Sequence, residues 1–362
     1  MIITSTTVVD LFSGAGGTGL GFKQEGFQIL GAVENNKHAA ETYEKNLDVK
    51  VKNINIRELE PQTFREELNL QRNQLDVLVG CPPCQGFSRM QKNNKGINHQ
   101  DNDLVIKYLD FVEEFMPKFA VFENVPGLIT KPYGHIFYEK LCLGLKELGY
   151  KRNEKLVDVA DYGVPQHRKR IIVIAGRNGE EPPFPQPTHG EPGKIDKSQT
   201  PLYPWLTVYD AIGNNKYPQL KPGENGEHDG KYPNHIAPKT TQKIVEFISM
   251  VPKNGGSRTD IPKQFWLKCH LSHKGHSDVY GRAAWNRPSN TITAGCLNPS
   301  KGRFIHPEQD RAFTPREVAA LQGFPDDFVF YGKCLQVQIG NAVPPPLAKA
   351  IAQELRHRLI QS

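Results

Sequence analysis

Short apolar runs alternate with amphipathic stretches along the first 177 residues of the chain. Short runs rich in β-branched residues are typical of buried strands, and apolar residues spaced three and four apart are typical of helices that bury one face. Strands are predicted over residues 7–11, 29–34, 49–54, 76–80, 120–123, 155–158 and 170–175, with helices between them, for example over residues 36–46 and 104–115. This alternation predicts an α/β fold with a doubly wound parallel sheet.

The pattern changes after Arg177. Eleven of the 28 prolines lie within residues 178–240, and the alternation of strands and helices stops there. A helical pattern returns near the C-terminus, where one face carries Leu347, Ile351, Leu355 and Leu359. We therefore expect a first domain over residues 1–178, a smaller second domain with a hinge over residues 179–310, and a return segment over residues 311–362 that completes the first domain.

The composition is that of an ordinary globular protein. The 362 residues suffice for two domains, and the hydrophobic and charged fractions of 38% and 23% exclude collagen-like, coiled-coil and wholly disordered chains. No apolar run approaches the roughly 20 residues that cross a bilayer, and the N-terminus lacks a signal-peptide pattern, so we expect a cytoplasmic protein. Six irregularly spaced cysteines predict reduced thiols rather than a disulfide framework.

The positive charge is concentrated in one segment. The chain has a net charge of +6, and residues 231–286 contain nine Lys or Arg against three Asp or Glu. The remainder of the chain is therefore neutral overall, and four histidines lie within the same basic segment. Such a segment is typical of a surface that binds a polyanion, while a solvated, loop-rich surface is an equal alternative.

A glycine-rich loop follows the first predicted strand. Gly14, Gly16 and Gly19 fit the pattern G-x-G-x-x-G, which lets the backbone approach a ligand where a strand turns into a helix. Glu34 follows Gly14 by twenty residues, at the end of the second strand, where it can accept hydrogen bonds from two ribose hydroxyls. These features predict a nucleotide-like cofactor without distinguishing a nicotinamide dinucleotide from S-adenosylmethionine. A glycine turn without a ligand is the alternative.

The fourth predicted strand ends in the sequence GCPPCQGFS, whose stiff Pro-Pro turn presents Cys84. Ligands bind at the carboxyl ends of the strands in an open α/β sheet, so we interpret Cys84 as a nucleophile. Cys81 and Cys84 have the spacing of a redox pair or half a zinc site, but a polar loop rather than a helix follows them. The second domain offers the other cluster, Cys269, His270, His273 and His276, among lysines, so no metal is predicted.

A carboxylate and two arginines follow further along the chain. Glu123 ends the fifth predicted strand at the same sheet edge as Cys84, where partial desolvation raises the pKa of a carboxyl and suits it to sharing a proton with a ring nitrogen. A strand-end salt bridge is the alternative for Glu123. Alternation predicts that Arg168 and Arg170 share one face, where two guanidinium groups bind a carboxylate, a carbonyl oxygen or a phosphate.

The ordered motifs FSGAGG, VENN, PPCQGFS, ENV, QHRKR, RPSNTITA and QIGNAV closely resemble those of the DNA (cytosine-5) methyltransferases, including those that accompany restriction systems. The resemblance runs from residue 8 to about residue 351 and is interrupted at about residues 178–280. It implies a Rossmann-like sheet domain of the kind found in methyltransferases that use S-adenosylmethionine, with a smaller inserted target recognition domain. The first domain would then be catalytic and cofactor-binding.

The resemblance implies a chemistry for each catalytic residue. Cys84 is similar to the thiolate that adds to cytosine C6, which makes C5 able to attack the methyl group of S-adenosylmethionine. Glu123 is similar to the carboxylate that contacts N3 and the exocyclic amine, and Arg168 to the arginine at the carbonyl oxygen, with Arg170 beside it. Because a stacked base is out of reach, the resemblance also implies base flipping.

The resemblance implies S-adenosylmethionine as the cofactor, with Glu34 on its ribose. Asn53 stands where the family usually has an aspartate that accepts a hydrogen bond from adenine N6, and the amide oxygen of Asn53 can still accept one. The residues expected to contact the cofactor are Phe12, Ala15, Gly16, Glu34, Asn35, Asn53, Pro83, Leu104, Asn341 and Val343.

Double-stranded DNA is the implied partner, and residues 178–280 correspond to the target recognition region, in agreement with their basic charge. In the loop after Cys84 the family's usual Asp-x-Arg-Asn is replaced by His-Gln-Asp-Asn at residues 99–102, and Lys92 and Lys95 can take the place of the missing arginine. The predicted DNA contacts are Gln85, Ser88, Lys92, Lys95, Arg258, Lys263, Lys268, His270 and Lys274.

The resemblance further implies a monomer at the nucleoid that protects DNA from a cognate restriction endonuclease. Two other functions remain alternatives: a tRNA cytosine-5 methyltransferase of the same fold, and a non-catalytic DNA-binding regulator. A nicotinamide oxidoreductase rests on the glycine loop alone.

Overall fold

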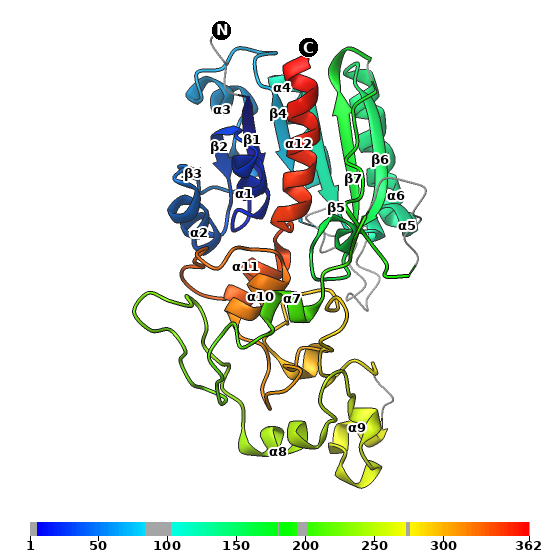
Figure 1. Cartoon of the computed structure of the whole chain (residues 1–362). Helices are drawn as coiled ribbons and strands as arrows, with labels where there is room; N and C mark the ends of the chain where they lie inside the picture. The colour runs from blue at the N-terminus through cyan, green and yellow to red at the C-terminus, as the bar shows by residue number, and fades with distance from the viewer. Residues whose placement is uncertain (1–5, 84–102, 180, 194–201, 273–275, 362) are drawn as a thin grey trace. The chain divides into compact units, whose positions relative to one another are not determined.

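The computed structural model describes residues 6–83, 103–179, 181–193, 202–272 and 276–361. The chain forms two compact units (Figure 1). Unit 1 comprises Met1–Asp158, Lys169–Gln186 and Pro345–Ser362, and unit 2 comprises Val159–Arg168 and Pro187–Pro344. The predicted return segment, residues 311–362, is therefore divided, since only its part from Pro345 onward belongs to unit 1.

Unit 1 contains a seven-stranded sheet with the order β3-β2-β1-β4-β5-β7-β6. The strands are β1 (Thr7–Leu11), β2 (Gln28–Val33), β3 (Val51–Lys52), β4 (Val77–Gly80), β5 (Phe119–Asn124), β6 (Lys151–Asp158) and β7 (Lys169–Gly176). All seven predicted strands are confirmed, but β7 runs antiparallel to both neighbours, so the expectation of a wholly parallel sheet is wrong. The reason is the short connection 159–168, because parallel neighbours need a crossover of a dozen or more residues.

The helices of unit 1 lie between and after these strands. They are α1 (Gly17–Gln24), α2 (Lys37–Leu47), α3 (Pro61–Glu67), α4 (Leu104–Phe115), α5 (Gly127–Thr130), α6 (Pro132–Glu147) and α12 (Pro345–Gln361), with 3-10 turns η1 (Ile56–Glu58) and η3 (Arg177–Gly179). The side chain of Asn36 caps α2 by accepting hydrogen bonds from the backbone of His38 and Ala39. Both helices named in the prediction are confirmed within a residue.

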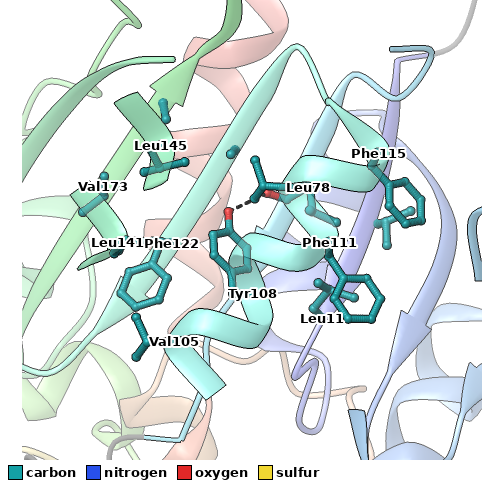
Figure 2. Close-up of a cluster of buried hydrophobic side chains, with 14 of the residues drawn as sticks. Leu11, Leu78, Val105, Tyr108, Phe111, Phe115, Phe122, Leu141, Leu145 and Val173 are labelled. Atoms are coloured by element: carbon teal, nitrogen blue, oxygen red, sulfur yellow. Dashed lines mark hydrogen bonds between the residues drawn. The ribbon is translucent and has the colours of Figure 1, made fainter. Parts of the chain in front are cut away.

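Helix α4 covers strands β4 and β5 with an aromatic face (Figure 2). Tyr108, Phe111 and Phe115 are fully buried there. The Tyr108 hydroxyl donates hydrogen bonds to the backbone oxygens of Leu78, at 3.4 Å, and Val121, at 3.0 Å. This packing fixes the two strands whose carboxyl ends carry the cysteine and glutamate motifs.

Helix α12 returns to unit 1 and packs against α1 (Figure 1). Three residues of its predicted apolar stripe, Leu347, Ile351 and Leu355, are buried, and the fourth, Leu359, is half-buried. The two helices approach closely at Gly21, where a Cβ atom would lie 2.5 Å from the backbone nitrogen of Lys349. A glycine is therefore required at this crossing.

Unit 2 has little regular structure. It contains η2 (Val159–Tyr162), a two-stranded sheet of β8 (His189–Gly190) and β9 (Tyr203–Pro204), and the helices α7 (Val208–Ile212), α8 (Gln242–Met250), α9 (Lys268–Ser272), α10 (Pro315–Leu321) and α11 (Leu335–Asn341), with 3-10 turns η4 (Arg258–Asp260), η5 (Lys263–Phe265) and η6 (Pro299–Lys301). Within the described ranges of both units, no helix is long and apolar enough to cross a membrane.

Buried arginines hold the loops of unit 2 together. The guanidinium of Arg282 is fully buried and donates hydrogen bonds to four backbone carbonyls, those of Ile248, Val251, His306 and Gln309. Arg311 forms a buried bidentate ion pair with Glu317, at 2.8 and 2.7 Å. Because irregular loops leave backbone carbonyls without ladder partners, guanidinium groups supply the missing donors.

Candidate functional site

The glycine loop turns sharply between β1 and α1. Phe12, Gly14 and Gly16 all have positive φ values, of 55°, 54° and 100°, and Gly16 caps the N-terminus of α1. The carboxylate of Glu34, which directly follows β2, accepts hydrogen bonds from the backbone nitrogens of Gly14 at 2.9 Å and Asn36 at 2.8 Å. Glu34 therefore braces the loop against the start of α2, and burial raises the pKa of its carboxyl.

Two glycines of the motif, Gly19 and Gly14, have different surroundings. A Cβ atom at Gly19 would lie 2.3 Å from the hydroxyl of Tyr43, so this position must be small for Tyr43 to pack beneath the loop. At Gly14 a Cβ atom would meet no described residue within 4 Å, so the described residues leave this side of the loop open. The space beside Gly14 is thus available to a ligand, as the glycine-loop prediction requires.

A buried acid lies under the same loop. Asp10 is 1% exposed, and the Tyr43 hydroxyl donates a hydrogen bond to its Oδ2 at 3.2 Å. Burial raises the pKa of the Asp10 carboxyl to about 7, with the charge of Glu34 adding to the rise and the Tyr43 hydrogen bond opposing it. A substantial fraction of Asp10 is therefore protonated near neutral pH.

The loop and its neighbours suit a nucleotide-like ligand. The buried hydroxyl of Ser13 has no hydrogen-bond partner among the described residues, so it is a polar group that a ligand could satisfy. The Asn53 side-chain nitrogen donates to the backbone oxygen of Glu34 at 2.7 Å, which leaves the amide oxygen as an acceptor. Glu34 and Asn53 lie just after the adjacent parallel strands β2 and β3.

The other predicted cofactor contacts lie in several places. Phe12, Ala15, Gly16 and Asn35 belong to the same loops of unit 1 as Glu34 and Asn53. Leu104 is 4% exposed and packs in the core cluster around α4. Asn341 ends α11 and Val343 follows it, both in unit 2.

The Pro-Pro turn follows β4 and is anchored by the ENV motif. The side-chain nitrogen of Asn124 donates to the backbone oxygen of Pro82 at 3.2 Å. Pro83 is the last described residue before residue 103. Five predicted site residues therefore lie outside the described residues: Cys84, Gln85, Ser88, Lys92 and Lys95.

The environment of Cys81 does not activate its thiol for nucleophilic attack. Burial raises the pKa of its thiol well above the ordinary value, and the nearby carboxylates of Glu123 and Asp10 add to the rise. The sulfur lies 3.9 Å from the hydroxyl of Thr18. A thiol that stays protonated is a poor attacking group, which favours Cys84 over Cys81 as the reactive cysteine.

Glu123 and Arg170 form an ion pair. Arg170 Nε lies 2.7 Å from Glu123 Oε1, and the side chains are only 11% and 13% exposed. Antiparallel pairing places Glu123 opposite Ile172, so Arg170 occupies the diagonal position on the neighbouring strand. The salt bridge that was the alternative for Glu123 is thus present, and its partner is itself a predicted site residue.

Arg168 belongs to the other unit and makes its own set of contacts there. Strand β7 begins at Lys169, so the alternation argument does not extend to Arg168, which belongs to unit 2. Its guanidinium is buried and donates to the backbone oxygens of Ile292 at 2.7 Å and Gly340 at 2.9 Å. Arg168 thus joins the TITA and GNAV segments of unit 2, and its predicted contact with the substrate stays a prediction.

Gln166 is a buried residue of unit 2 to which the sequence prediction assigned no role. It is fully buried, its Oε1 accepts from the backbone nitrogen of Ile292 at 2.7 Å, and its Nε2 donates to Gln322. Together with Arg168 it joins the QHR segment to the TITA segment. Its presence in the QHRKR motif was the available signal.

The predicted DNA contacts in unit 2 divide into exposed and buried groups. Lys263 and Lys268 are exposed, and Lys274 lies outside the described residues. Arg258 is 1% exposed, with its guanidinium 5.2 Å from the centre of the Trp266 ring, so its prediction as a direct DNA contact is wrong. His270 is half-buried and its ring lies edge-on to Tyr280 at 5.5 Å.

Comparison with known proteins places these features in one family. Residues 6–357 match the family of C-5 cytosine-specific DNA methylases. The chain is 39% identical over 353 residues to the Type II methyltransferase M1.HphI of Haemophilus parahaemolyticus, covering 96% of this chain and 86% of that protein. It is 34% identical over 364 residues to the Type II methylase M.HgiDII of Herpetosiphon aurantiacus, covering 97% and 95%.

Solved structures share the fold at lower sequence identity. A prophage-encoded E. coli protein superposes with a TM-score of 0.71 at 24% identity, covering 99% of this chain and 100% of that one. A DNMT2 of Spodoptera frugiperda superposes with a TM-score of 0.61 at 19% identity, covering 97% and 100%. The predicted methyltransferase fold is thus confirmed.

Proposed function

The chain belongs to the C-5 cytosine-specific DNA methylase family, and from that premise we propose that it methylates C5 of a cytosine within one specific DNA sequence. It is accordingly a DNA (cytosine-5) methyltransferase of the restriction-modification type. The observation that carries the proposal for its site is the buried Glu123–Arg170 ion pair at the sheet edge where the Pro-Pro turn leads to Cys84.

Cys84 is the nucleophile in this proposal. Its thiolate adds to C6 of the target cytosine, so electron density moves into the ring and C5 becomes nucleophilic. After C5 has gained the methyl group, it loses its proton and Cys84 is eliminated, which restores the aromatic ring and the free thiolate. The raised pKa of the Cys81 thiol keeps this neighbouring cysteine protonated and out of the reaction.

Glu123 and Arg170 act together on the pyrimidine ring. Glu123 holds N3 and the exocyclic amine, and it shares a proton with N3 as negative charge develops during the addition of Cys84. Arg170 orients this carboxylate and presents a cation toward the carbonyl oxygen of the base. Arg168 is a positioning residue, because its guanidinium is used by the backbone oxygens of unit 2.

S-Adenosylmethionine is the proposed cofactor, and when bound it supplies an electrophilic methyl group. Each carboxylate oxygen of Glu34 accepts one backbone hydrogen bond and can accept a second from a ribose hydroxyl. The amide oxygen of Asn53 accepts a hydrogen bond from the adenine amine. The unpartnered hydroxyl of Ser13 and the open side of Gly14 fit the same ligand. Phe12, Ala15, Gly16, Asn35, Pro83, Leu104, Asn341 and Val343 remain proposed contacts.

Double-stranded DNA is the proposed substrate, with the target base flipped out of the helix. Lys263 and Lys268 bind backbone phosphates, as do Lys92 and Lys95 in the loop after Cys84. We further propose that the enzyme works as a monomer at the nucleoid in the cytoplasm, and that it protects DNA from a cognate restriction endonuclease with the same recognition sequence.

The test is mass spectrometry of hydrolysed DNA and RNA from cells that express the wild type or Cys84→Ser. The proposal predicts that 5-methylcytosine rises in DNA, with the wild type only. A rise in RNA alone would favour the tRNA methyltransferase alternative. Methylation by both proteins would remove Cys84 from the mechanism, and methylation by neither would favour a DNA-binding regulator without catalysis.

A further inference from the structure

The Pro-Pro turn after β4 has few hydrogen-bond donors of its own. Pro82 and Pro83 follow Cys81, and neither proline has a backbone N–H group. Pro82 is buried, so its carbonyl oxygen needs a donor from another part of the protein. The two prolines can therefore be held only by packing and by hydrogen bonds to their carbonyl oxygens.

The strand that leads into this turn is firmly seated. The ring of Tyr108 packs against Gly80, where a Cβ atom would lie 2.3 Å from it. The Tyr108 hydroxyl bridges β4 and β5 (Figure 2). The backbone nitrogen of Cys81 donates to the backbone oxygen of Leu11 at 3.4 Å. The chain is thus fixed as far as Cys81, and the next contact determines the path of the turn.

Asn124 supplies that contact. It is 1% exposed, and its Nδ2 donates to the oxygen of Pro82 at 3.2 Å, while its Oδ1 accepts from the backbone nitrogen of Val125 at 2.9 Å. The register of β4 and β5 pairs Gly80 with Phe122, so Pro82 comes beside Asn124 two residues further along. Within the described ranges, no second donor reaches the Pro82 oxygen. An amide suits this place because it donates and accepts at once.

The same strand end carries Glu123. The Glu123 carboxylate reaches toward β7, where it pairs with Arg170 at 2.7 Å, whereas Asn124 reaches toward β4. Two consecutive residues of β5 thus hold the carboxylate on one side and the Pro-Pro turn on the other. The distance between the carboxylate and the turn is therefore set by one short piece of backbone.

We propose that Asn124 is a positioning residue for the nucleophile, because its hydrogen bond to Pro82 fixes the turn that leads to Cys84 at a set place relative to Glu123. This inference rests on the proposed function, and it gives a role to the second residue of the ENV motif. A displacement of about 1 Å between reacting groups can cost about 100-fold in rate. Loss of the bond should therefore slow the addition of Cys84 to cytosine.

The chain contains a matched control for this bond. Asn153 of the edge strand β6 donates from Nδ2 to the oxygen of Pro182, also at 3.2 Å. The substitutions Asn124→Asp and Asn153→Asp both keep the size of the side chain and remove the donor. They break the same type of bond, in one case at the turn and in the other away from it.

The experiment measures how fast the full-length protein becomes covalently attached to DNA that contains 5-fluorocytosine at the target site, with S-adenosylmethionine present. Asn124→Asp should form this adduct about 100-fold more slowly than the wild type. Asn153→Asp should stay within about 3-fold of the wild-type rate.

A second measurement separates positioning from a general structural role. Calorimetry should show that both variants bind S-adenosylmethionine within about 3-fold of the wild-type affinity, because only Pro83 of the proposed cofactor contacts lies in the turn. A purely structural role for Asn124 would lower the affinity and the rate of adduct formation together.

The proposal is overturned if Asn124→Asp forms the adduct as fast as the wild type, or if its cofactor affinity falls by the same factor as its rate. Asn124→Ala, which introduces no charge, should show the same slow adduct formation. A wild-type rate with Asn124→Ala would attribute the effect of Asn124→Asp to a buried carboxylate and would also overturn the proposal.

Failure of the proposed function has a different result, because the wild-type protein would then form no adduct. Amide hydrogen exchange at Cys81 decides the inference in that case. If Asn124 holds the turn, exchange at Cys81 should be faster in Asn124→Ala than in the wild type. Equal exchange in the two proteins would show that the turn does not depend on Asn124.

Discussion

Glu123 and Arg170 lie far apart in the sequence and meet because β7 runs antiparallel to β5. Sequence reasoning identified both residues from their motifs, but the ion pair depends on strand direction and register, which alternation does not specify. Arg168 and Arg258 show the opposite case. Arg168 was predicted to contact the substrate from strand alternation and its motif, and Arg258 from its place in the basic segment. Both are buried, since loops without ladder hydrogen bonds need buried donors.

The ion pair predicts that Glu123→Gln lowers methyl transfer by about 100-fold or more, because an amide cannot share the proton of N3. The melting temperature should fall by only a few degrees, since Gln keeps an oxygen that faces Arg170. Steady-state kinetics with thermal unfolding measure both quantities. Glu154→Gln is the matched control, because Glu154 pairs with Arg152 at 3.3 Å on β6. Equal losses of activity in the two variants would contradict a specific role for Glu123.

Asp10 makes the stability of unit 1 depend on pH. Its pKa is about 7 in the folded protein against an ordinary value of 3.8, so between these pH values the folded state holds a proton that the unfolded state releases. The contribution of Asp10 to the free energy of unfolding is therefore largest below about pH 4. It decreases as the pH rises to about 7, and above that pH it no longer changes.

Asp10→Asn should remove this pH dependence, because an amide does not titrate. Relative to the wild type, the variant should gain on the order of 3–4 kcal/mol of unfolding free energy between pH 4 and pH 8. Urea unfolding of both proteins at a series of pH values measures the difference. A difference that stays constant with pH would show that Asp10 is ionised in the folded protein.

At the scale of elements, most of unit 1 could be predicted from apolar periodicity. All seven strands and the helix α4 lie where the pattern placed them, because burial against one core sets the period. The direction of β7 could not be predicted from its own residues, since it follows from the ten-residue connection to β6. Nor could periodicity reveal that residues 311–344 fold with unit 2, which depends on contacts between distant residues, such as the hydrogen bond from Arg311 Nε to the backbone oxygen of Leu220 at 3.2 Å.

The close contact between α1 and α12 leaves no room for an added methyl group at Gly21. Gly21→Ala should destabilise the protein by about 1–3 kcal/mol, because the new Cβ atom meets the backbone of Lys349 and the Cβ atom of Ala348. Gly144→Ala in α6 is the control, since the three atoms nearest to its Cβ atom would all belong to the movable side chain of Leu109. Urea unfolding should show Gly144→Ala to be neutral or slightly stabilising. Equal effects of the two variants would contradict the close approach of α12.

At the scale of the whole molecule, one unit carries the sheet with its candidate active site and the other carries most of the positive charge. Unit 2 uses part of that charge internally, since Arg258 and Arg282 are buried and Lys253 pairs with Asp310. The basic segment therefore offers fewer exposed cations than its sequence suggests. Lys263 and Lys268 are exposed and can bind a polyanion. Their exposure is consistent with the proposal that unit 1 carries out catalysis and unit 2 binds DNA.

The most direct test of the central claim is covalent trapping on DNA that contains 5-fluorocytosine at the target site. After methyl transfer, fluorine cannot leave C5 as a proton does, so Cys84 cannot be eliminated and the protein stays bound to the base. We expect a denaturant-stable complex with the wild type in the presence of S-adenosylmethionine, and none with Cys84→Ser. A complex of equal yield with Cys84→Ser would contradict the account.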